Sequence, residues 1–174
     1  QMTGRGLEQR MTPCLVPASS PLGQLEGGTN MIILDGGDSG QIVLRGAGAG
    51  EGPTASAVMS DILDLARGLR LNTFGQPAKT LQKAQPATTT TPAPFYLRIQ
   101  LLDKPGALAK IATVMGEAGV SIDRMRQYGH DADKAPVLIV THETTRAAID
   151  RVLVDFDITE VVEGTPVALR IETA

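Results

Sequence analysis

A glycine-rich loop between a short apolar run and a helical pattern constrains this chain more than any other feature. The apolar run is residues 42–44, and the glycines that follow occupy alternate positions, Gly46, Gly48, Gly50 and Gly52. After the loop, apolar residues recur at the spacing of one helix face, at Val58, Ile62, Leu65 and Leu69. This order predicts a strand, a tight turn and a helix with a buried stripe. The chain must therefore contain a packed α/β segment.

The start of the predicted helix has the chemistry of a ligand-approach site. Glycines let the backbone come close to a ligand, and the first helical turn leaves N–H groups free. Pro53 suits that turn because its missing N–H is not needed there, and Thr54 and Ser56 are available as caps. The loop fails the dinucleotide pattern G-x-G-x-x-G, because Glu51 and Pro53 occupy the possible third glycine positions. A ligand loop and a plain tight turn both remain open.

Composition limits the classes of protein to consider. The 174 residues suffice for one domain of ordinary size or two small ones, and the 42% apolar fraction supports a packed core. The net charge of -3 argues against a nucleic-acid surface, and the single Cys14 excludes an internal disulfide. We find neither an apolar run of membrane-spanning length nor a signal segment, so we expect a cytosolic protein without a membrane partner.

The first 75 residues predict an incomplete mixed α/β segment. Two apolar runs flank a turn at residues 35–38, which predicts a hairpin whose acids are turn residues rather than metal ligands. Two strands and one helix are too few for a stable sheet domain. Because Gln1 lies within a strand-like context, we expect further strands upstream in a longer protein. Residues 76–94, with four successive threonines between prolines, predict a flexible extended linker.

Residues 95–174 predict a second unit with the order βαββαβ. Apolar residues alternate from Phe95 to Leu101, a turn follows at residues 103–106, and a helix pattern ends at Gly119. Two further strands precede a helix capped by Thr144 or Thr145, and a final strand alternates through Ile171. This order is the ferredoxin-like α+β arrangement, which serves many functions. The two histidines, His130 and His142, are expected in a loop and at a strand end, without ligand partners.

Three blocks of the sequence resemble homoserine dehydrogenases. The block RGAGAGEGPTASAVMSDILDLARG is similar to the end of the catalytic portion of that family, and GRGLEQRMTPCLVPASSPLGQLEGGTN precedes it in the same order. Downstream, DKPGALAKIATVMGEAGVSI and APVLIVTHETT also resemble the family, and DKPGALAKIA resembles the start of an ACT domain. The resemblance implies residues 1–75 of the catalytic region, a linker at 76–94, and an ACT regulatory domain at 95–174.

The resemblance implies an oxidoreductase that interconverts L-homoserine and L-aspartate 4-semialdehyde with NAD(P), toward threonine, methionine and isoleucine. It places the loop residues Gly48, Ala49 and Gly50 near the cofactor. It places no catalytic residue here, because none of the lysines matches a catalytic position of the family. We therefore expect the chain alone to be inactive. One departure is Ser20, where the family commonly has histidine before Pro-Leu.

The ACT resemblance implies an amino-acid effector site at the start of the first helix of the second unit. Gly106 allows close approach, and the N–H groups of Gly106, Ala107 and Leu108 can hold a carboxylate. Asp103 can cap the helix or meet an ammonium group, although the same residues also suit a plain turn. The implied effector is L-threonine, and the implied assembly is a homodimer or homotetramer through this domain. Two alternatives stay open: a stand-alone amino-acid sensor, and an ACT domain that only dimerises.

Overall fold

The computed structural model of the chain describes residues 1–129 and 134–172. Its contacts group them into two units, which we call the large unit and the small unit. The large unit combines residues 1–16 with the described residues from 85 onward, and the small unit is residues 17–84. No helix in the described part of the chain has the length and apolarity needed to cross a bilayer.

The large unit has the βαββαβ order that the sequence predicts. Its elements are β6 (Phe95–Leu102), α2 (Ala107–Glu117), β7 (Ile122–Gln127), β8 (Lys134–Thr141), α3 (Arg146–Ile158) and β9 (Val162–Ile171). The sheet order is β3-β9-β6-β8-β7, with β6 antiparallel to both β8 and β9. The predicted α+β, ferredoxin-like fold is confirmed. A fifth strand, β3 (Cys14–Leu15), adds parallel to β9 from the N-terminal segment.

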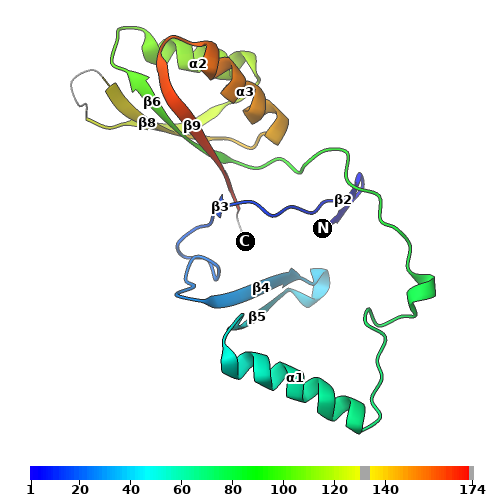
Figure 1. The fold of residues 1–174 in the computed structure, drawn as a ribbon. Coiled ribbons are helices and arrows are strands. Elements are labelled where there is room, and N and C mark those ends of the chain that lie inside the picture. The colour runs from blue at the N-terminus through cyan, green and yellow to red at the C-terminus, as the bar shows by residue number, and fades with distance from the viewer. Residues whose placement is uncertain (130–133, 173–174) are drawn as a thin grey trace. The chain divides into compact units, whose positions relative to one another are not determined.

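One apolar core holds this sheet to its helices. The alternate residues of β6 point inward and are at most 2% exposed, at Phe95, Leu97, Ile99 and Leu101. They pack against buried residues of both helices, Ala107, Ile111 and Met115 from α2 and Ile149, Val152 and Phe156 from α3. Figure 1 shows α2 and α3 on the same face of the sheet. The Thr145 side chain accepts a hydrogen bond from the Ala148 N–H, which confirms the predicted cap of α3.

The N-terminal segment forms short strands against the second half of the predicted linker. The strands β1 (Met2–Thr3) and β2 (Gly6–Leu7) pair with each other. Leu7 donates to Gln85 O at 2.8 Å and accepts from Ala87 N–H at 2.9 Å. Further along, Ala93 and Thr144 exchange two backbone hydrogen bonds. Residues 85–93 are thus fastened by hydrogen bonds within the large unit. The flexible linker at 76–94 stays a prediction. The boundaries at 75 and 95 stay predictions.

The small unit contains a hairpin and one helix. The strands β4 (Thr29–Asp35) and β5 (Gln41–Ala47) pair antiparallel around a short 3₁₀ turn, η1 (Gly37–Ser39), which confirms the predicted hairpin. The Asp35 carboxylate accepts the Gly37 N–H at 3.0 Å, the role of a turn residue. The helix α1 (Glu51–Ala66) follows, and a second 3₁₀ turn, η2 (Ala78–Thr80), lies in the first half of the predicted linker.

Two expectations about α1 are wrong. The helix begins at Glu51, so its N-cap is Gly50 rather than Thr54 or Ser56, and the Thr54 hydroxyl donates back to Gly50 O at 2.7 Å. The predicted buried stripe is exposed: Val58, Ile62, Leu65 and Leu69 are each 46–62% exposed. The reason is physical, since no other described element covers this face.

Candidate functional site

The glycine-rich loop connects the end of β5 to the start of α1 through Gly48, Ala49 and Gly50. Gly50 has φ 117° and ψ 158°, a conformation that side-chain-bearing residues avoid. A Cβ on Gly48 would lie 1.8 Å from Nδ2 of Asn30, so glycine lets the Asn30 side chain lie against the loop. The loop thus requires glycine at these two positions for different reasons.

The start of α1 offers a ligand backbone donors rather than charged side chains. The Thr54 N–H and hydroxyl both donate to Gly50 O, while helix geometry leaves the N–H groups of Glu51 and Gly52 without intrahelical partners. An open hollow of about 550 Å³ adjoins them and is lined by Gly50, Glu51, Thr54, Ala55, Val58 and Met59. Because its lining includes an acid and no base, this hollow alone would bind a phosphate weakly. The cofactor role of Gly48, Ala49 and Gly50 stays a prediction.

A second candidate site lies at the start of α2, in the large unit. All four predicted effector residues, Asp103, Gly106, Ala107 and Leu108, line one hollow of about 280 Å³. That volume is near the lower end of small-ligand pockets and suits a molecule the size of one amino acid. Gly106 is the N-cap of α2 with φ 84°, and no atom lies within 4 Å of a Cβ added there. The backbone is therefore open to a ligand at this point.

The hydrogen bonds of the turn decide which donors a ligand can reach. The Ala107 N–H donates to Lys104 O at 3.1 Å, and Ala107 is 3% exposed. Ala107 therefore shapes the hollow but does not supply the free donor that we expected from it. Helix geometry leaves the Leu108 N–H without an intrahelical acceptor, and the positive end of the α2 dipole favours an anion there.

The structure adds two polar residues to this hollow that sequence reasoning missed, Lys104 and Gln127. Lys104 lies in the predicted turn itself, so the cation in DKPG was a usable signal. Gln127 ends β7, and only the pairing of β7 with β8 in the folded sheet brings it here. With Asp103, the hollow holds a cation, a carboxylate, an amide and a helix N-terminus beside Leu101 and Leu102. This set matches the two charges and short side chain of a zwitterionic amino acid.

Other hollows offer less chemistry. One of about 340 Å³ is lined by Arg10, Arg146 and Arg170 with Thr12, Thr90 and Phe95. Its arginines already bind carboxylates, Arg146 through Asp150 and the other two through Glu172. Cys14 is exposed, and His142 donates its backbone N–H to Ser121 O. His130 lies outside the described residues.

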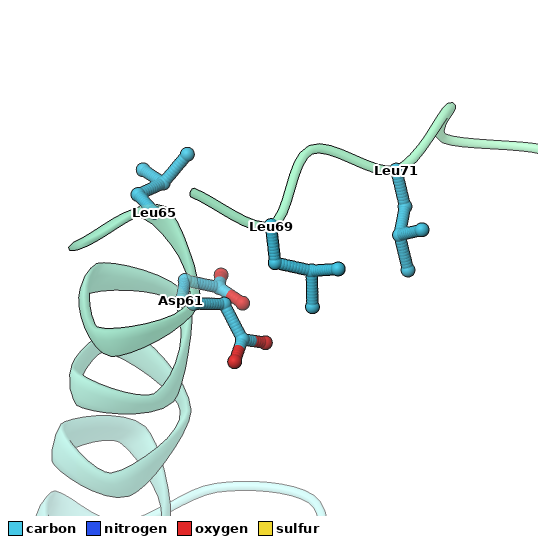
Figure 2. A pocket seen from close by; sticks show the side chains of 5 residues that line it. Asp61, Leu65, Leu69 and Leu71 are labelled. Atoms are coloured by element: carbon cyan, nitrogen blue, oxygen red, sulfur yellow. The ribbon is translucent and has the colours of Figure 1, made fainter. Parts of the chain in front are cut away.

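A further hollow, of about 340 Å³, lies at the end of α1. Figure 2 shows Leu69 and Leu71 projecting to the same side from the segment after the helix, near Asp61. Leu65 and Asp64 complete its lining. The leucines are 46–81% exposed, so this hollow is a dent in an uncovered apolar surface. An uncovered surface of this kind typically marks a contact with other protein.

Two family models match the chain in separate regions. Residues 1–63 match homoserine dehydrogenase, and residues 95–157 match the ACT domain. The chain is 35% identical over 179 residues to a homoserine dehydrogenase of Neisseria gonorrhoeae, covering 98% of this chain and 41% of that relative. It is 31% identical over 177 residues to that of Bacillus subtilis, again covering 41% of the relative. The chain thus spans about two-fifths of the length of these relatives.

A solved structure has the same fold over nearly all of this chain. The homoserine dehydrogenase from Thiobacillus denitrificans superposes with a TM-score of 0.85 at 26% identity, covering 99% of this chain and 41% of that one. The homoserine dehydrogenase of S. aureus, at 18% identity and a TM-score of 0.52, shares the fold over 93% of this chain.

Proposed function

We infer a function for this chain from its family: residues 1–63 belong to the homoserine dehydrogenase family, and residues 95–157 form an ACT domain. We propose that the chain is the C-terminal part of an NAD(P)-dependent homoserine dehydrogenase, which interconverts L-homoserine and L-aspartate 4-semialdehyde in the cytoplasm. The reaction lies on the route toward threonine, methionine and isoleucine. The observation that supports this most is that both family matches occur in this order on a chain of which 98% aligns with a homoserine dehydrogenase.

The chain's own part in that reaction is to support the cofactor rather than to move protons. The nicotinamide cofactor supplies the hydride chemistry when bound. The glycine backbone at 48–50 admits a ligand closely, and the first turn of α1 can donate N–H groups to it. Since no base lines this hollow, the remaining contacts must come from the rest of the enzyme. The exposed apolar face of α1 gives that remainder a surface to cover.

A hydride-transfer assay tests this function. We expect the proposed longer enzyme to reduce NAD(P) with L-homoserine, followed by the absorbance of the reduced nicotinamide, and the 174-residue chain to give no turnover. Turnover by the chain alone would overturn the proposal that the chain only supports the cofactor. Failure of the longer enzyme to accept L-homoserine would overturn the function.

We propose that the ACT domain binds L-threonine in the hollow at the start of α2 as a feedback effector. Its carboxylate would meet Lys104 and the Leu108 N–H, and its ammonium group would meet Asp103. We expect L-threonine to slow the longer enzyme, and Lys104→Gln to relieve this inhibition without changing the uninhibited rate. Inhibition that Lys104→Gln leaves unchanged would place the effector elsewhere.

An ACT domain that only dimerises is the second candidate, because β7 is an exposed edge strand of the sheet. A strand edge of this kind can pair with a second copy, giving a homodimer or homotetramer. Sedimentation of the chain with and without L-threonine distinguishes the two, since a purely structural dimer forms equally in both.

A further inference from the structure

A buried carboxylate joins three segments of the large unit that lie far apart in the sequence. Glu8, in the N-terminal segment, is 8% exposed. Its Oε2 accepts two hydrogen bonds from Thr91, at 3.0 Å from the N–H and 2.6 Å from the hydroxyl. Its Oε1 accepts from Arg10 Nη1 at 2.5 Å. Thr91 belongs to residues 85–93, which we call the strap.

The strap is also held from the other side, by β9. Arg170 donates from Nη1 to Thr91 O at 2.8 Å, and from Nε to the carboxylate of Glu172 at 2.6 Å. Arg10 donates to the same Glu172 carboxylate. The charged side chains around Glu8 are therefore Arg10, Arg170 and Glu172, and the nitrogen of Gln1 donates to Glu8 O at 2.8 Å. The positive charges of the two arginines equal the negative charges of the two carboxylates. Glu8 is therefore a paired and not an isolated buried charge.

The strap contributes little to the apolar core: Ala93, which is 5% exposed, is its one buried residue. The buried core cluster of the described chain runs from Phe95 to Val161, with partly buried neighbours up to Ala168, and includes no residue before 95. The strap is attached to residues 1–16 by hydrogen bonds, those of Leu7 with Gln85 and Ala87 and those of Thr91 with Glu8. Segments with few apolar contacts to a core open locally at low cost.

We propose that Glu8 is the latch between residues 1–16 and the strap: when it pairs with Thr91 the two segments are held together, and when it does not, they separate while the core stays folded. This proposal goes beyond the proposed function. It also connects Glu8, through two strands, to the hollow at the start of α2. The strap continues directly into β6, whose other end at Leu101 and Leu102 lines the effector hollow. β9 pairs with β6 at both ends, at Val162 near the hollow and at Arg170 in the latch. The latch thus lies at the far end of the same two strands.

Amide hydrogen exchange of the full chain, resolved by residue, tests the latch. Glu8→Gln keeps the shape of the side chain but removes its charge. We expect exchange to become at least tenfold faster at the amides of Thr91, Leu7 and Ala87, and to stay unchanged at Leu97 and Ile139 in the core. Thr91→Val keeps the ion pairs, so we expect a smaller rise at the same strap amides. Asp150→Asn, which breaks an exposed ion pair on α3, is the matched control without effect there.

Two results would overturn the latch. If Glu8→Gln leaves the strap amides as protected as before, other contacts hold the strap. If it raises exchange equally at Leu97 and Ile139, the strap is part of one cooperative unit with the core. Neither result depends on the effector or on the enzyme reaction, so a failure here is distinct from a failure of the proposed function.

Discussion

At the scale of single residues, Gly106 adopts a left-handed backbone conformation and lines the hollow at the start of α2. Its φ of 84° lies in the left-handed region, which costs a residue with a Cβ roughly 1–2 kcal/mol. The space around it is open, so the cost of a substitution comes from the backbone and not from a clash. Gly116, inside α2, also has open space but no positive φ, and is therefore a matched control.

We predict opposite effects of alanine at these two glycines. Gly106→Ala should lower the free energy of unfolding by about 1–2 kcal/mol. Gly116→Ala should raise it by up to about 1 kcal/mol, because alanine is the better helix former. Urea unfolding of the two variants checks this. Equal stabilities would show that the turn at Gly106 relaxes.

Two carboxylates of the latch titrate below their ordinary range. The Thr91 hydroxyl, followed by the Thr91 N–H and the charges of Arg10 and Arg170, lowers the pKa of Glu8 below 4.5, although burial opposes this. Burial also opposes the shift at Glu172, but hydrogen bonds from Arg170 and Arg10 outweigh it and lower the pKa of Glu172. Because both folded pKa values are depressed, the ionised groups stabilise the fold at higher pH.

Because the folded-state pKa values of Glu8 and Glu172 are lowered, the stability of the fold decreases as the pH falls. The contribution of Glu8 is complete above its unfolded pKa, near 4.5, and is lost as the pH falls through the lower folded pKa. We predict that the wild-type chain loses more free energy of unfolding between pH 6 and pH 3 than Glu8→Gln does. Urea midpoints across this range measure the difference. Parallel pH profiles would contradict the assignment.

At the scale of elements, the sequence predicted the structures that depend on interactions between residues close together in the chain. The hairpin, the βαββαβ order and the Thr145 cap are confirmed, since turn residues, alternation and capping act over a few residues. The buried stripe of α1 was wrong, because periodicity shows that a face is apolar but not that the chain covers it. At the hollow at the start of α2, the residues from Asp103 to Leu108 could be predicted because they lie in one turn of the sequence. Gln127 could not, because only the pairing of β7 with β8 brings it there.

The N-cap of α3 should contribute measurably to the free energy of unfolding. Thr145→Ala removes the acceptor of the Ala148 N–H and should cost about 0.5–2 kcal/mol of unfolding free energy. Thr113 lies inside α2, where its hydroxyl bonds back to Ala109 O and caps nothing. Thr113→Ala should therefore be neutral or slightly stabilising. Thermal unfolding followed by circular dichroism compares the two variants, and equal losses would show that the cap bond carries no stability.

At the scale of the whole molecule, the two family regions do not coincide with the two compact units. The homoserine dehydrogenase match covers residues 1–63, yet residues 1–16 belong to the large unit with the ACT domain. Within the homoserine dehydrogenase match, β3 thus adds a strand to the five-stranded sheet of the large unit. The small unit, by contrast, leaves its apolar helix face exposed.

That face gives a prediction for the longer enzyme. Ile62 is 50% exposed in this chain, so Ile62→Lys should change its stability by less than about 0.5 kcal/mol. In the proposed longer enzyme we expect a loss of about 1.5–3 kcal/mol, because we expect the rest of that enzyme to bury this side chain. Met11→Lys, at a residue that is 99% exposed, is the control in both proteins. An equally silent Ile62→Lys in the longer enzyme would show that nothing covers the face.

Calorimetric titration of the chain with L-threonine tests most directly whether the hollow at the start of α2 binds an amino-acid effector. We predict saturable binding that is tighter than that of L-serine, L-methionine or L-isoleucine. Lys104→Gln should weaken it at least tenfold, or about 1.4 kcal/mol, by removing the cation from the hollow. Lys110→Gln removes an exposed lysine that does not line the hollow, and should leave binding unchanged. No binding, or equal weakening by both variants, would contradict the account.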